Sequence, residues 1–315
     1  MEKEKILNMK ILVTGKNGLM GCALQKTQTP GHEFVFIGRE EVDLTNEQEV
    51  ESMFRILKPD WVIHTAAKVG GIGGNINEPA DMFHKNILMN THIIHYAYKY
   101  NVQKLLAFSS VCVFPDGIPV LREDLMQQGE PYHTQFAYAT AKRAIDSQIK
   151  SYKKQYGERQ YCSIIPCNIF GPEDYYNLQS GHVIPSLIHK IYLAKKNNTL
   201  LTVWGDGSAK REFIYSHDIA RIVLEIINLD TIPERIIVSN NNQITIKDMV
   251  ERLCYEAGYE REIIWDTTKP NGQHARPSDL TLLNSLIQKP NYTNMNMALK
   301  DSYNWFEINY PKVRM

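Results

Sequence analysis

Three side chains have the types and spacing of a proton-transfer site: Ser110, Tyr138 and Lys142. The Tyr-x-x-x-Lys spacing puts a phenol and an ammonium one turn apart on one face of a helix. Because a cation stabilises a phenolate, we expect Lys142 to lower the pKa of Tyr138 below its ordinary value of about 10. Ser110 can hydrogen-bond the same substrate oxygen and orient it. The three residues therefore predict an acid that protonates a carbonyl oxygen.

A glycine-rich turn follows the first apolar segment, Lys10–Thr14, and reads Gly15-Lys16-Asn17-Gly18-Leu19-Met20-Gly21. Its glycines permit a tight turn and let the backbone approach a pyrophosphate, which the N-terminus of the following helix then stabilises. A plain connection between strand and helix is the alternative. We predict that these residues bind a dinucleotide.

The end of the second apolar segment indicates which dinucleotide binds. NAD-preferring sites usually carry an acidic residue there, against the ribose hydroxyls, whereas this segment ends in Arg39. Arg39 offers a planar cation to a 2′-phosphate, and Lys16 can reach the same group. A solvated Arg39 beside Glu40 and Glu41 is the alternative. The pattern favours NADPH.

Apolar segments that alternate with amphipathic stretches would position these residues. The apolar segments are Lys10–Thr14, 33–38, 60–67, 104–110 and 161–170, and the amphipathic stretches are 19–28, 47–58, 79–100 and 138–156. Strand, helix, strand at this spacing predicts a Rossmann-type, doubly wound parallel sheet with right-handed crossovers. Ligands should lie at the carboxyl ends of its strands.

The composition changes after Gly171-Pro172, where the chain becomes irregular and rich in Asn, Tyr, Ser and Gly. We therefore expect a dinucleotide-binding domain over 1–172 and a smaller C-terminal α/β lobe for the substrate over 173–315. Residues 212–240, which hold a helical stretch and a strand-like segment, are expected to return to the first domain. Substrate should lie between the two parts.

The overall composition gives no sign of a nucleic-acid or membrane partner. Lys plus Arg and Asp plus Glu each total 35 in 315 residues, so the formal net charge is +0. The five cysteines form no Cys-x-x-Cys pair and no metal-ligand spacing with histidine, which argues against a metal site and favours a reducing cytoplasm. Residues 1–9 are interpreted as a short extension, without the apolar run of a signal peptide.

Successive motifs along most of the chain resemble those of the GDP-L-fucose synthase family, which belongs to the extended short-chain dehydrogenases/reductases that modify nucleotide sugars. The motifs are AAKVGGIGGN from Ala66, EPADMFHKN from Glu78, SSVCVFP from Ser109, YATAK from Tyr138, HVIPSLI from His182, VWGDGSAKREF from Val203 and KPNG from Lys269. The resemblance implies an NADP-dependent enzyme that takes GDP-4-keto-6-deoxy-mannose, epimerises carbons 3 and 5, and reduces carbon 4.

The resemblance also assigns further cofactor contacts. Asp43, followed by Leu44, matches the position at which the family's aspartate meets the adenine. The loop after the third strand, with Ala66, Ala67 and Lys68, matches the loop that faces the cofactor, and Lys142 also reaches the nicotinamide ribose in this family.

Cys112 and His182 match the family's epimerisation pair. A ketone at carbon 4 acidifies the protons on both neighbouring carbons, so one base and one acid beside Tyr138 and Ser110 could invert either centre. A Cys112 thiolate near cations is the expected base, and His182 is expected to protonate the carbon or relay a proton. Without the resemblance, Cys112 would be interpreted as a small core residue and His182 as a helix cap.

Contacts to the nucleotide sugar are expected mainly from the smaller lobe. Arg211 and Arg276 suit bidentate binding of a pyrophosphate, with surface ion pairs as the alternative, and Trp204 suits the guanine or its ribose. Asn168 follows the fifth strand, where the sugar should sit. Lys190 and Lys269 complete the expected substrate-binding set.

The sequence departs from the family pattern in two places. Lys190 stands where the family often carries arginine, and Gln273-His274-Ala275-Arg276 replaces its usual basic pair. The sugar, a hexose or a heptose, is therefore left open, and a C4 reductase that works after a separate epimerase is the first alternative. An NDP-sugar 4-epimerase or dehydratase would hold NAD, against which Arg39 argues, and an NADP sensor should have lost the Ser-Tyr-Lys set.

The stretch 79–100 predicts a helix with two apolar faces. Phe83, Ile87, Ile94 and Ala97 lie on one face, and Met82, Met89, Ile93 and Tyr96 lie on the other. Two such faces predict two partners, the sheet and a second subunit, and hence a homodimer.

Overall fold

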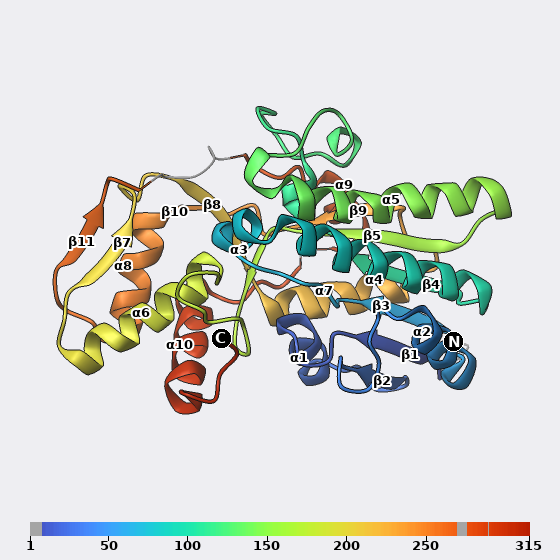
Figure 1. Cartoon of the computed structure of the whole chain (residues 1–315), viewed down its shortest axis with the longest axis horizontal. Helices are drawn as coiled ribbons and strands as arrows, with labels where there is room; N and C mark the ends of the chain where they lie inside the picture. The colour runs from blue at the N-terminus through green and yellow to red at the C-terminus, as the bar shows by residue number, and fades with distance from the viewer. Residues whose placement is uncertain (1–7, 270–275, 289) are drawn as a thin grey trace.

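A six-stranded parallel sheet forms the centre of the larger part of the protein (Figure 1). The computed structural model describes residues 8–269, 276–288 and 290–315. The strands, in the order β2–β1–β3–β4–β5–β9, are Glu33–Ile37, Lys10–Thr14, Trp61–His64, Lys104–Phe108, Gln160–Pro166 and Arg235–Val238. The order reverses between β1 and β3, which is the switch point where doubly wound sheets bind ligands. The predicted Rossmann-type fold class is confirmed.

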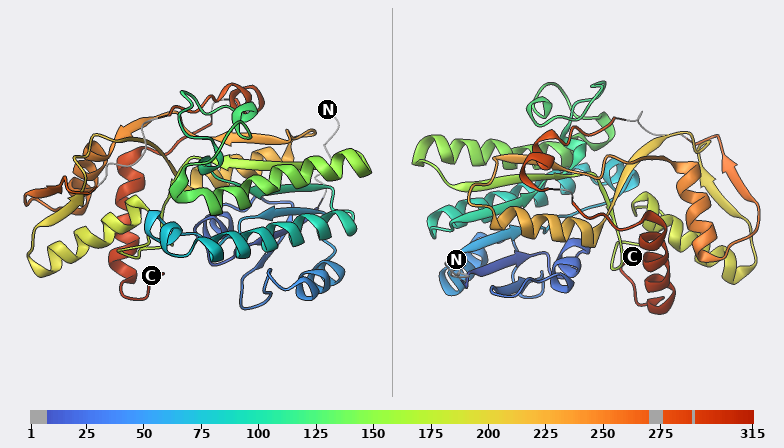
Figure 2. Two further views of the ribbon diagram at one scale, coloured as in Figure 1. Left: turned by 45° about the horizontal axis from the view of Figure 1, so that its top comes forward. Right: turned by 180° about the vertical axis from the view of Figure 1, so that it is seen from behind.

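Helices cover both faces of this sheet and so bury its strands on both sides. Ile11 and Val13 of β1 face the core shared with α1 (Leu19–Lys26), α7 (Ser216–Asn228) and α9 (Thr281–Leu286). Leu12, between them, faces the core shared with α2 (Glu47–Leu57), α4 (Pro79–Lys99) and α5 (Phe136–Tyr156). Figure 2 shows α4 and α5 lying side by side over one face and α7 running across the other.

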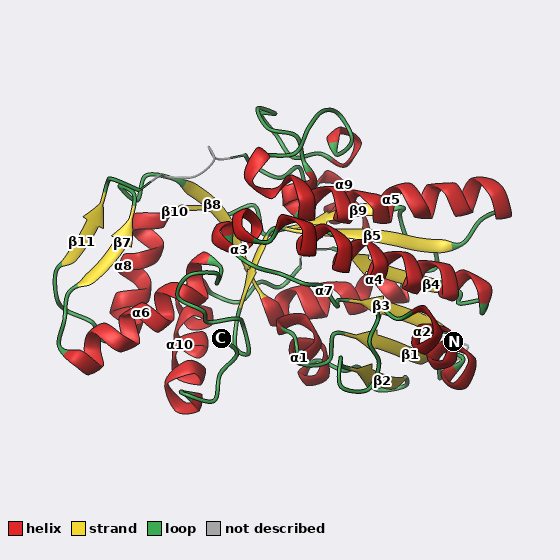
Figure 3. Cartoon of the chain, in the orientation of Figure 1, coloured by secondary structure: helices red, strands yellow, loops and turns green. Residues whose placement is uncertain are grey.

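A second hydrophobic core lies in the smaller part of the molecule, at the left of Figure 3. Its helices are α6 (Val183–Asn197), α8 (Ile246–Ala257) and α10 (Met295–Asn309). β7 (Leu201–Trp204) pairs with β11 (Ile263–Asp266), and β8 (Lys210–Tyr215) lies between β6 (Asn168–Phe170) and β10 (Gln243–Thr245). Among the described residues, no helix has both the length and the apolar character needed to cross a membrane.

Short helical segments lie in the connections that follow β3 and β4 of the larger part. They are α3 (Ile72–Asn77) and the 3-10 turns η1 (Val111–Val113), η2 (Glu123–Leu125) and η3 (His133–Gln135). η1 follows β4 directly, and η3 leads into α5, so both flank the segments that carry Ser110 and Tyr138.

Three local predictions differ from the structure. The segment 161–170, predicted as one strand, forms two: β5 in the central sheet and β6 in the three-stranded sheet. A continuous apolar run does not show this change of sheet, because both strands are buried. The predicted helix at 138–156 begins at Phe136. On α4, Ile94 and Ala97 are buried together with the opposite apolar face, so the exposed side carries fewer apolar residues than predicted.

Candidate active site

The glycine turn between β1 and α1 has no space for a side chain at Gly15 or Gly21. Gly15 has a φ of +84°, and a Cβ there would lie 2.7 Å from the Thr65 hydroxyl. A Cβ on Gly21 would lie 2.1 Å from the carbonyl oxygen of Gly15. Gly18 is the N-cap of α1 and offers no side-chain cap, which leaves the first amides of this helix available to an anion. Leu19 and Met20 form the first turn of α1, as predicted.

The two predicted 2′-phosphate cations are in different surroundings. Lys16 forms a close ion pair with Glu41, and its Nζ lies 3.8 Å from Glu40. The Asn17 amide donates to Glu40 at 2.7 Å, and the second Glu41 oxygen accepts the Gly38 N–H at 2.7 Å. Arg39 is exposed at the end of β2. The carboxylates beside the site therefore engage the lysine of the glycine turn.

The adjoining loops of the predicted cofactor site are held by short-range hydrogen bonds. The Asp43 carboxylate accepts from the backbone and hydroxyl of Thr45, which lowers its pKa below the usual range. Leu44 is buried. Asn86 of α4 accepts from the Lys68 N–H at 3.1 Å and donates to its carbonyl at 2.9 Å, which fixes the loop that contains Ala66 and Ala67. The Lys68 ammonium contacts Glu78 at 2.6 Å.

Ser110, Tyr138 and Lys142 come from adjacent elements around the end of β4. Ser110 caps η1, and its hydroxyl oxygen accepts from the Cys112 N–H at 3.4 Å. Lys142 is buried on α5, donates to the Phe108 carbonyl at 2.7 Å, and lies 5.9 Å from the Tyr138 ring centre. The predicted arrangement of serine, phenol and ammonium is thus geometrically possible.

The predicted lowering of the Tyr138 pKa is not found in the protein alone. Burial, and to a lesser extent the nearby Cys112, raise the pKa of Tyr138 above its ordinary value. Burial also lowers the pKa of Lys142 to about 8. The Tyr-x-x-x-Lys spacing placed the Lys142 cation beside Tyr138 as predicted, but this ammonium donates to the Phe108 carbonyl. The low-dielectric surroundings of Tyr138 disfavour its phenolate form. Tyr138 is therefore a neutral phenol, the form that can donate a proton.

Cys112 lies among the same groups but is not a thiolate. Burial raises the pKa of its thiol to about 11, although Ser110, Lys142 and Arg276 each act to lower it. The expectation of a thiolate base at this position is corrected accordingly. At neutral pH the Cys112 side chain is a thiol and can act as a proton donor.

His182 lies at the N-cap of α6 beside a loop of glycines. The residue retains exposed surface, yet desolvation of its imidazole lowers its pKa, and a hydrogen bond with the Gly70 backbone partly offsets this. The Gly71 N–H donates to the Ser180 carbonyl at 2.6 Å, and a Cβ on Gly71 would lie 2.4 Å from the Gly181 oxygen. Close backbone contact between the two loops therefore fixes the surroundings of the neutral imidazole.

Three of the predicted substrate residues form one cluster in the smaller part. Trp204 is 58% exposed, with the Lys190 ammonium 5.4 Å and the Lys269 ammonium 5.7 Å from its ring. An exposed indole between two cations suits a planar base next to phosphates. The remaining KPNG residues and Gln273 to Ala275 lie outside the described residues.

Arg211 and Arg276 belong to a second cluster, which a buried carboxylate organises. Glu212 accepts from the Ser278 N–H at 3.0 Å and from its hydroxyl at 2.6 Å, which joins the Arg211 strand to the Arg276 segment. Arg276 donates to the Pro115 carbonyl at 2.6 Å, and its charge lowers the pKa of Arg211, behind the larger effect of burial. Asn168 donates to the Glu212 carbonyl at 2.8 Å.

Sequence reasoning did not find two supporting sites. Glu212 is one, although its place inside the VWGDGSAKREF motif, directly after Arg211, was a usable signal. The other is a buried chain in which His64 hydrogen-bonds the Thr14 hydroxyl at 2.7 Å and the Asn90 oxygen at 3.1 Å. Asn90 in turn donates to the Ala141 carbonyl at 3.2 Å, next to Lys142. Burial lowers the pKa of His64 to about 3, so it stays neutral.

Comparisons with known proteins agree with this geometry. Residues 11–238 match the model of the NAD dependent epimerase/dehydratase family. GDP-L-fucose synthase of Dictyostelium discoideum is 36% identical over 96% of this chain and 97% of its own length.

Solved structures give the same result for the fold. The structure of a GDP-L-fucose synthetase from Naegleria fowleri bound to NADP has a TM-score of 0.91 and 33% identity, and the match covers 98% of this chain and 95% of that one. A GDP-mannoheptose C4 reductase from Campylobacter jejuni with NADP bound has a TM-score of 0.82 and 26% identity, over 95% and 98% of the two chains.

Proposed function

The chain belongs to the NAD dependent epimerase/dehydratase family, within it to the GDP-L-fucose synthases, and we propose that it reduces the C4 ketone of a GDP-4-keto sugar with NADPH. The observation that carries the proposal is the cluster of Ser110, Cys112, Tyr138 and Lys142 at the end of β4. A neutral phenol beside a serine hydroxyl is suited to protonating a ketone oxygen.

The residues present fit a dinucleotide. The cradle between Gly15 and Gly21 is one that a Cβ would fill, and the uncapped N-terminus of α1 offers amides to a pyrophosphate. Arg39 supplies an exposed cation at the end of β2, where a 2′-phosphate would lie. When bound, the reduced nicotinamide supplies the hydride for carbon 4.

The side chains of the site divide the work of reduction. Tyr138 donates a proton to the ketone oxygen as negative charge develops there. The Ser110 oxygen already accepts from the Cys112 N–H, so its own hydrogen remains available to the same ketone oxygen. Lys142, held by the Phe108 carbonyl, places a positive charge beside this cluster and favours the developing oxyanion.

Epimerisation at carbons 3 and 5 is the second part of the proposal. The ketone acidifies both neighbouring carbons, and Tyr138 and Ser110 stabilise the resulting enolate oxygen. In the described structure the neutral His182 imidazole is able to accept a proton and the Cys112 thiol is able to donate one. The two groups therefore provide one acceptor and one donor, with Cys112 in the opposite role from the thiolate that its family position suggested.

The GDP part is assigned to the two cationic clusters of the smaller part. Trp204, Lys190 and Lys269 suit the base and its ribose, whereas Arg211 and Arg276, joined through Glu212, suit the pyrophosphate or the sugar next to it. Asn168 faces the same region from β6. The division into a dinucleotide-binding domain, 1–172 with 212–240, and a substrate lobe follows from this assignment.

A second candidate function is reduction at carbon 4 without epimerisation. With a thiol pKa near 11, Cys112 does not supply a thiolate base, so of this pair only the His182 imidazole can deprotonate both carbons, which favours this candidate. The similarity to a GDP-mannoheptose C4 reductase supports it as well. A heptose would then be the sugar of interest.

We also propose that the protein works as a cytoplasmic homodimer. The exposed side of α4 and α5 carries an aromatic group in which the Tyr98 and Tyr156 rings stack at 4.6 Å and Tyr152 meets Tyr98 edge-on at 5.3 Å. Phe83 is 40% exposed and Tyr156 is 50% exposed. Light scattering at micromolar concentration tests this, and a monomer would refute the dimer.

The experiment that tests the proposed activity uses purified protein, NADPH and a panel of GDP-4-keto sugars that includes 6-deoxyhexoses and heptoses. The expected result is NADPH oxidation that depends on the sugar. Turnover with tightly retained NAD and no net NADPH oxidation would instead identify a 4-epimerase or dehydratase. Cofactor binding without turnover of any sugar would identify a sensor.

A further inference from the structure

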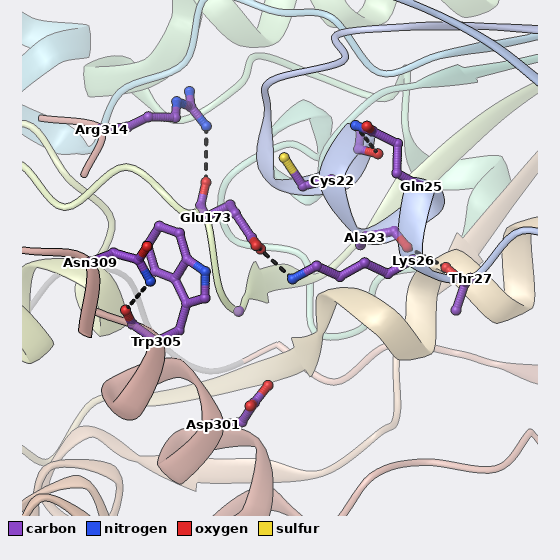
Figure 4. A network of polar contacts seen from close by, with 12 residues as sticks. Cys22, Ala23, Gln25, Lys26, Thr27, Glu173, Asp301, Trp305, Asn309 and Arg314 are labelled. Atoms are coloured by element: carbon purple, nitrogen blue, oxygen red, sulfur yellow. Dashed lines mark hydrogen bonds and ion pairs between the residues drawn. The ribbon is translucent and has the colours of Figure 1, made fainter. Parts of the chain in front are cut away.

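The residue after Gly171-Pro172 joins three segments that are far apart in the sequence. Glu173 accepts from the Lys26 ammonium of α1 at 2.6 Å through its side chain. Its carbonyl accepts from the Arg314 guanidinium, near the end of the chain, at 3.2 Å. Figure 4 shows Arg314 reaching the Glu173 carbonyl from above and Lys26 reaching its carboxylate from the right.

The backbone of Glu173 adopts a conformation that this residue type rarely has. Its φ is +59°, in the left-handed region. Residues other than Gly, Asn and Asp are uncommon in this region, because their side chains crowd the backbone. Such a conformation persists where surrounding contacts fix it. The Glu173 side chain is only 18% exposed, so its carboxylate is held within the structure and not simply solvated.

Contacts continue from Arg314 along the segment that leads to His182. The Arg314 carbonyl accepts from the Tyr176 N–H at 2.8 Å, and Tyr175 pairs with Arg314 in a parallel bridge. The Tyr175 hydroxyl lies 3.2 Å from the Ser180 hydroxyl. The 174–182 segment is thus attached to the chain end at its start and to the Gly70–Gly71 loop at its finish.

We propose that Glu173 is a positioning residue: by joining α1 to Arg314, it fixes the 174–182 segment, and hence His182, relative to the cofactor helix. The inference rests on the proposed function for its catalytic consequence, but not for its structural one. α1 carries the uncapped N-terminus expected to hold the pyrophosphate, so Glu173 connects the cofactor side to the side that exchanges protons with the sugar.

Two variants break the ion pair between Lys26 and Glu173, each by changing one of the two partners. Glu173→Asn removes the reach to Lys26 but retains a residue type that tolerates positive φ, which protects folding. Lys26→Met removes the cation and leaves Glu173 intact. The matched control is Glu51→Gln, which breaks the 2.5 Å Lys99–Glu51 ion pair between α4 and α2, on the opposite side of the larger part.

The first measurement is amide hydrogen exchange of the full chain without ligands. We expect exchange in peptides covering 174–182 to rise by roughly 10-fold in both variants, with no change in β9 peptides and none in the control. Unchanged exchange over 174–182 in both variants would overturn the inference. This result does not depend on whether the protein epimerises.

The second measurement separates positioning from general damage. With a GDP-4-keto sugar in deuterated water, both variants should lose roughly 10- to 100-fold in deuterium incorporation at carbons 3 and 5, while the KM for NADPH changes less than about 2-fold. Full incorporation in a variant with a loosened segment would overturn the positioning role. An unmodified protein that reduces without incorporation contradicts the proposed epimerisation instead, and the amide exchange still decides the role of Glu173.

Discussion

The ammonium of Lys142 lies 5.9 Å from the centre of the Tyr138 ring and donates to the Phe108 carbonyl, so the lysine is anchored beside the phenol and does not bond to it. Burial keeps Tyr138 in its neutral form. The phenol is therefore ready to donate a proton, and the cation stabilises charge that appears only during the reaction.

The first prediction concerns this proton donor. Tyr138→Phe removes the hydroxyl without changing the ring, and NADPH oxidation should fall by roughly 10²- to 10⁴-fold. The dissociation constant for NADP⁺, measured by fluorescence titration, should stay within about 2-fold, since the glycine turn is untouched. Lys142→Ala should weaken both turnover and cofactor binding. Full turnover by Tyr138→Phe would assign the proton to another group.

The second prediction concerns cofactor choice. NADPH should support turnover better than NADH, and Arg39→Ala should remove most of that preference, because Arg39 is the exposed cation at the end of β2. Glu41→Gln should increase the preference, since it releases Lys16 and removes a charge that repels a 2′-phosphate. The measurement is kcat/KM for both cofactors in each variant. Equal efficiency in the unmodified protein would show that Arg39 is misassigned.

The placement of residues was predicted well where it depends on local spacing. The glycine turn and the Tyr-x-x-x-Lys pair lie within one strand-helix connection and one helical turn, so the sequence alone positions them. Lys190, Trp204 and Lys269 were selected from separate parts of the sequence. In the structure, the pairing of β7 with β11 brings Trp204 and Lys269 together, and Lys190 joins them from α6.

Other features depended on contacts that no local pattern shows. The hydrogen bonds between Glu212 and Ser278 and between His64 and Asn90 join residues that are distant in sequence. Polar residue types such as Glu, Ser and Asn are mostly exposed in proteins, so their residue type alone predicts a surface position. The predicted protonation states of Tyr138 and Cys112 were wrong for a related reason. The prediction assumed that nearby charges set both pKa values, whereas burial is the larger effect in the structure.

The third prediction tests the contact between the two loops around His182. Gly71→Ala would place a Cβ 2.4 Å from the Gly181 oxygen, so one loop must move. Gly74→Ala, three residues further along in α3, is the matched control, because its Cβ would meet nothing closer than 3.4 Å. Deuterium incorporation at carbons 3 and 5 should fall by roughly 10-fold or more in Gly71→Ala and remain normal in Gly74→Ala. Equal effects of the two substitutions would refute the close-contact explanation.

The fourth prediction concerns stability and pH. Burial raises the pKa of Asp174 to about 7, and its Oδ2 has no hydrogen-bond partner among the described residues. The native state therefore binds its proton more tightly than the unfolded state, and this carboxyl destabilises the fold progressively as pH rises from about 4 to about 7. Asp174→Asn should raise the free energy of unfolding by about 1–3 kcal/mol at pH 8 and by less at pH 5, where less of the carboxyl's penalty has developed. The new amide lacks one partner, which limits the gain at both pH values.

Denaturant unfolding at the two pH values measures this difference. Asp266→Asn is the comparison of opposite sign, since hydrogen bonds from Thr268 lower the pKa of that carboxylate. Its stabilising contribution is present at pH 8 and is lost as pH falls. An Asp174→Asn variant whose gain is the same at pH 5 and pH 8 would show that the native carboxyl is not the origin of the effect.

The last prediction separates reduction from epimerisation. Reduction requires a proton at the ketone oxygen, so Cys112→Ser should leave NADPH oxidation largely intact with a keto sugar that already has the product configuration at carbons 3 and 5. The same substitution should sharply reduce inversion at those carbons, and the deuterium incorporation that accompanies inversion, since a serine hydroxyl is a much weaker acid than the Cys112 thiol. Mass spectrometry of the product measures both effects in one reaction. The unmodified protein gives the most informative result, because reduction in deuterated water without exchange at carbons 3 and 5 would mean that Cys112 and His182 do not act as an epimerisation pair, and the protein would then be a C4 reductase that follows a separate epimerase.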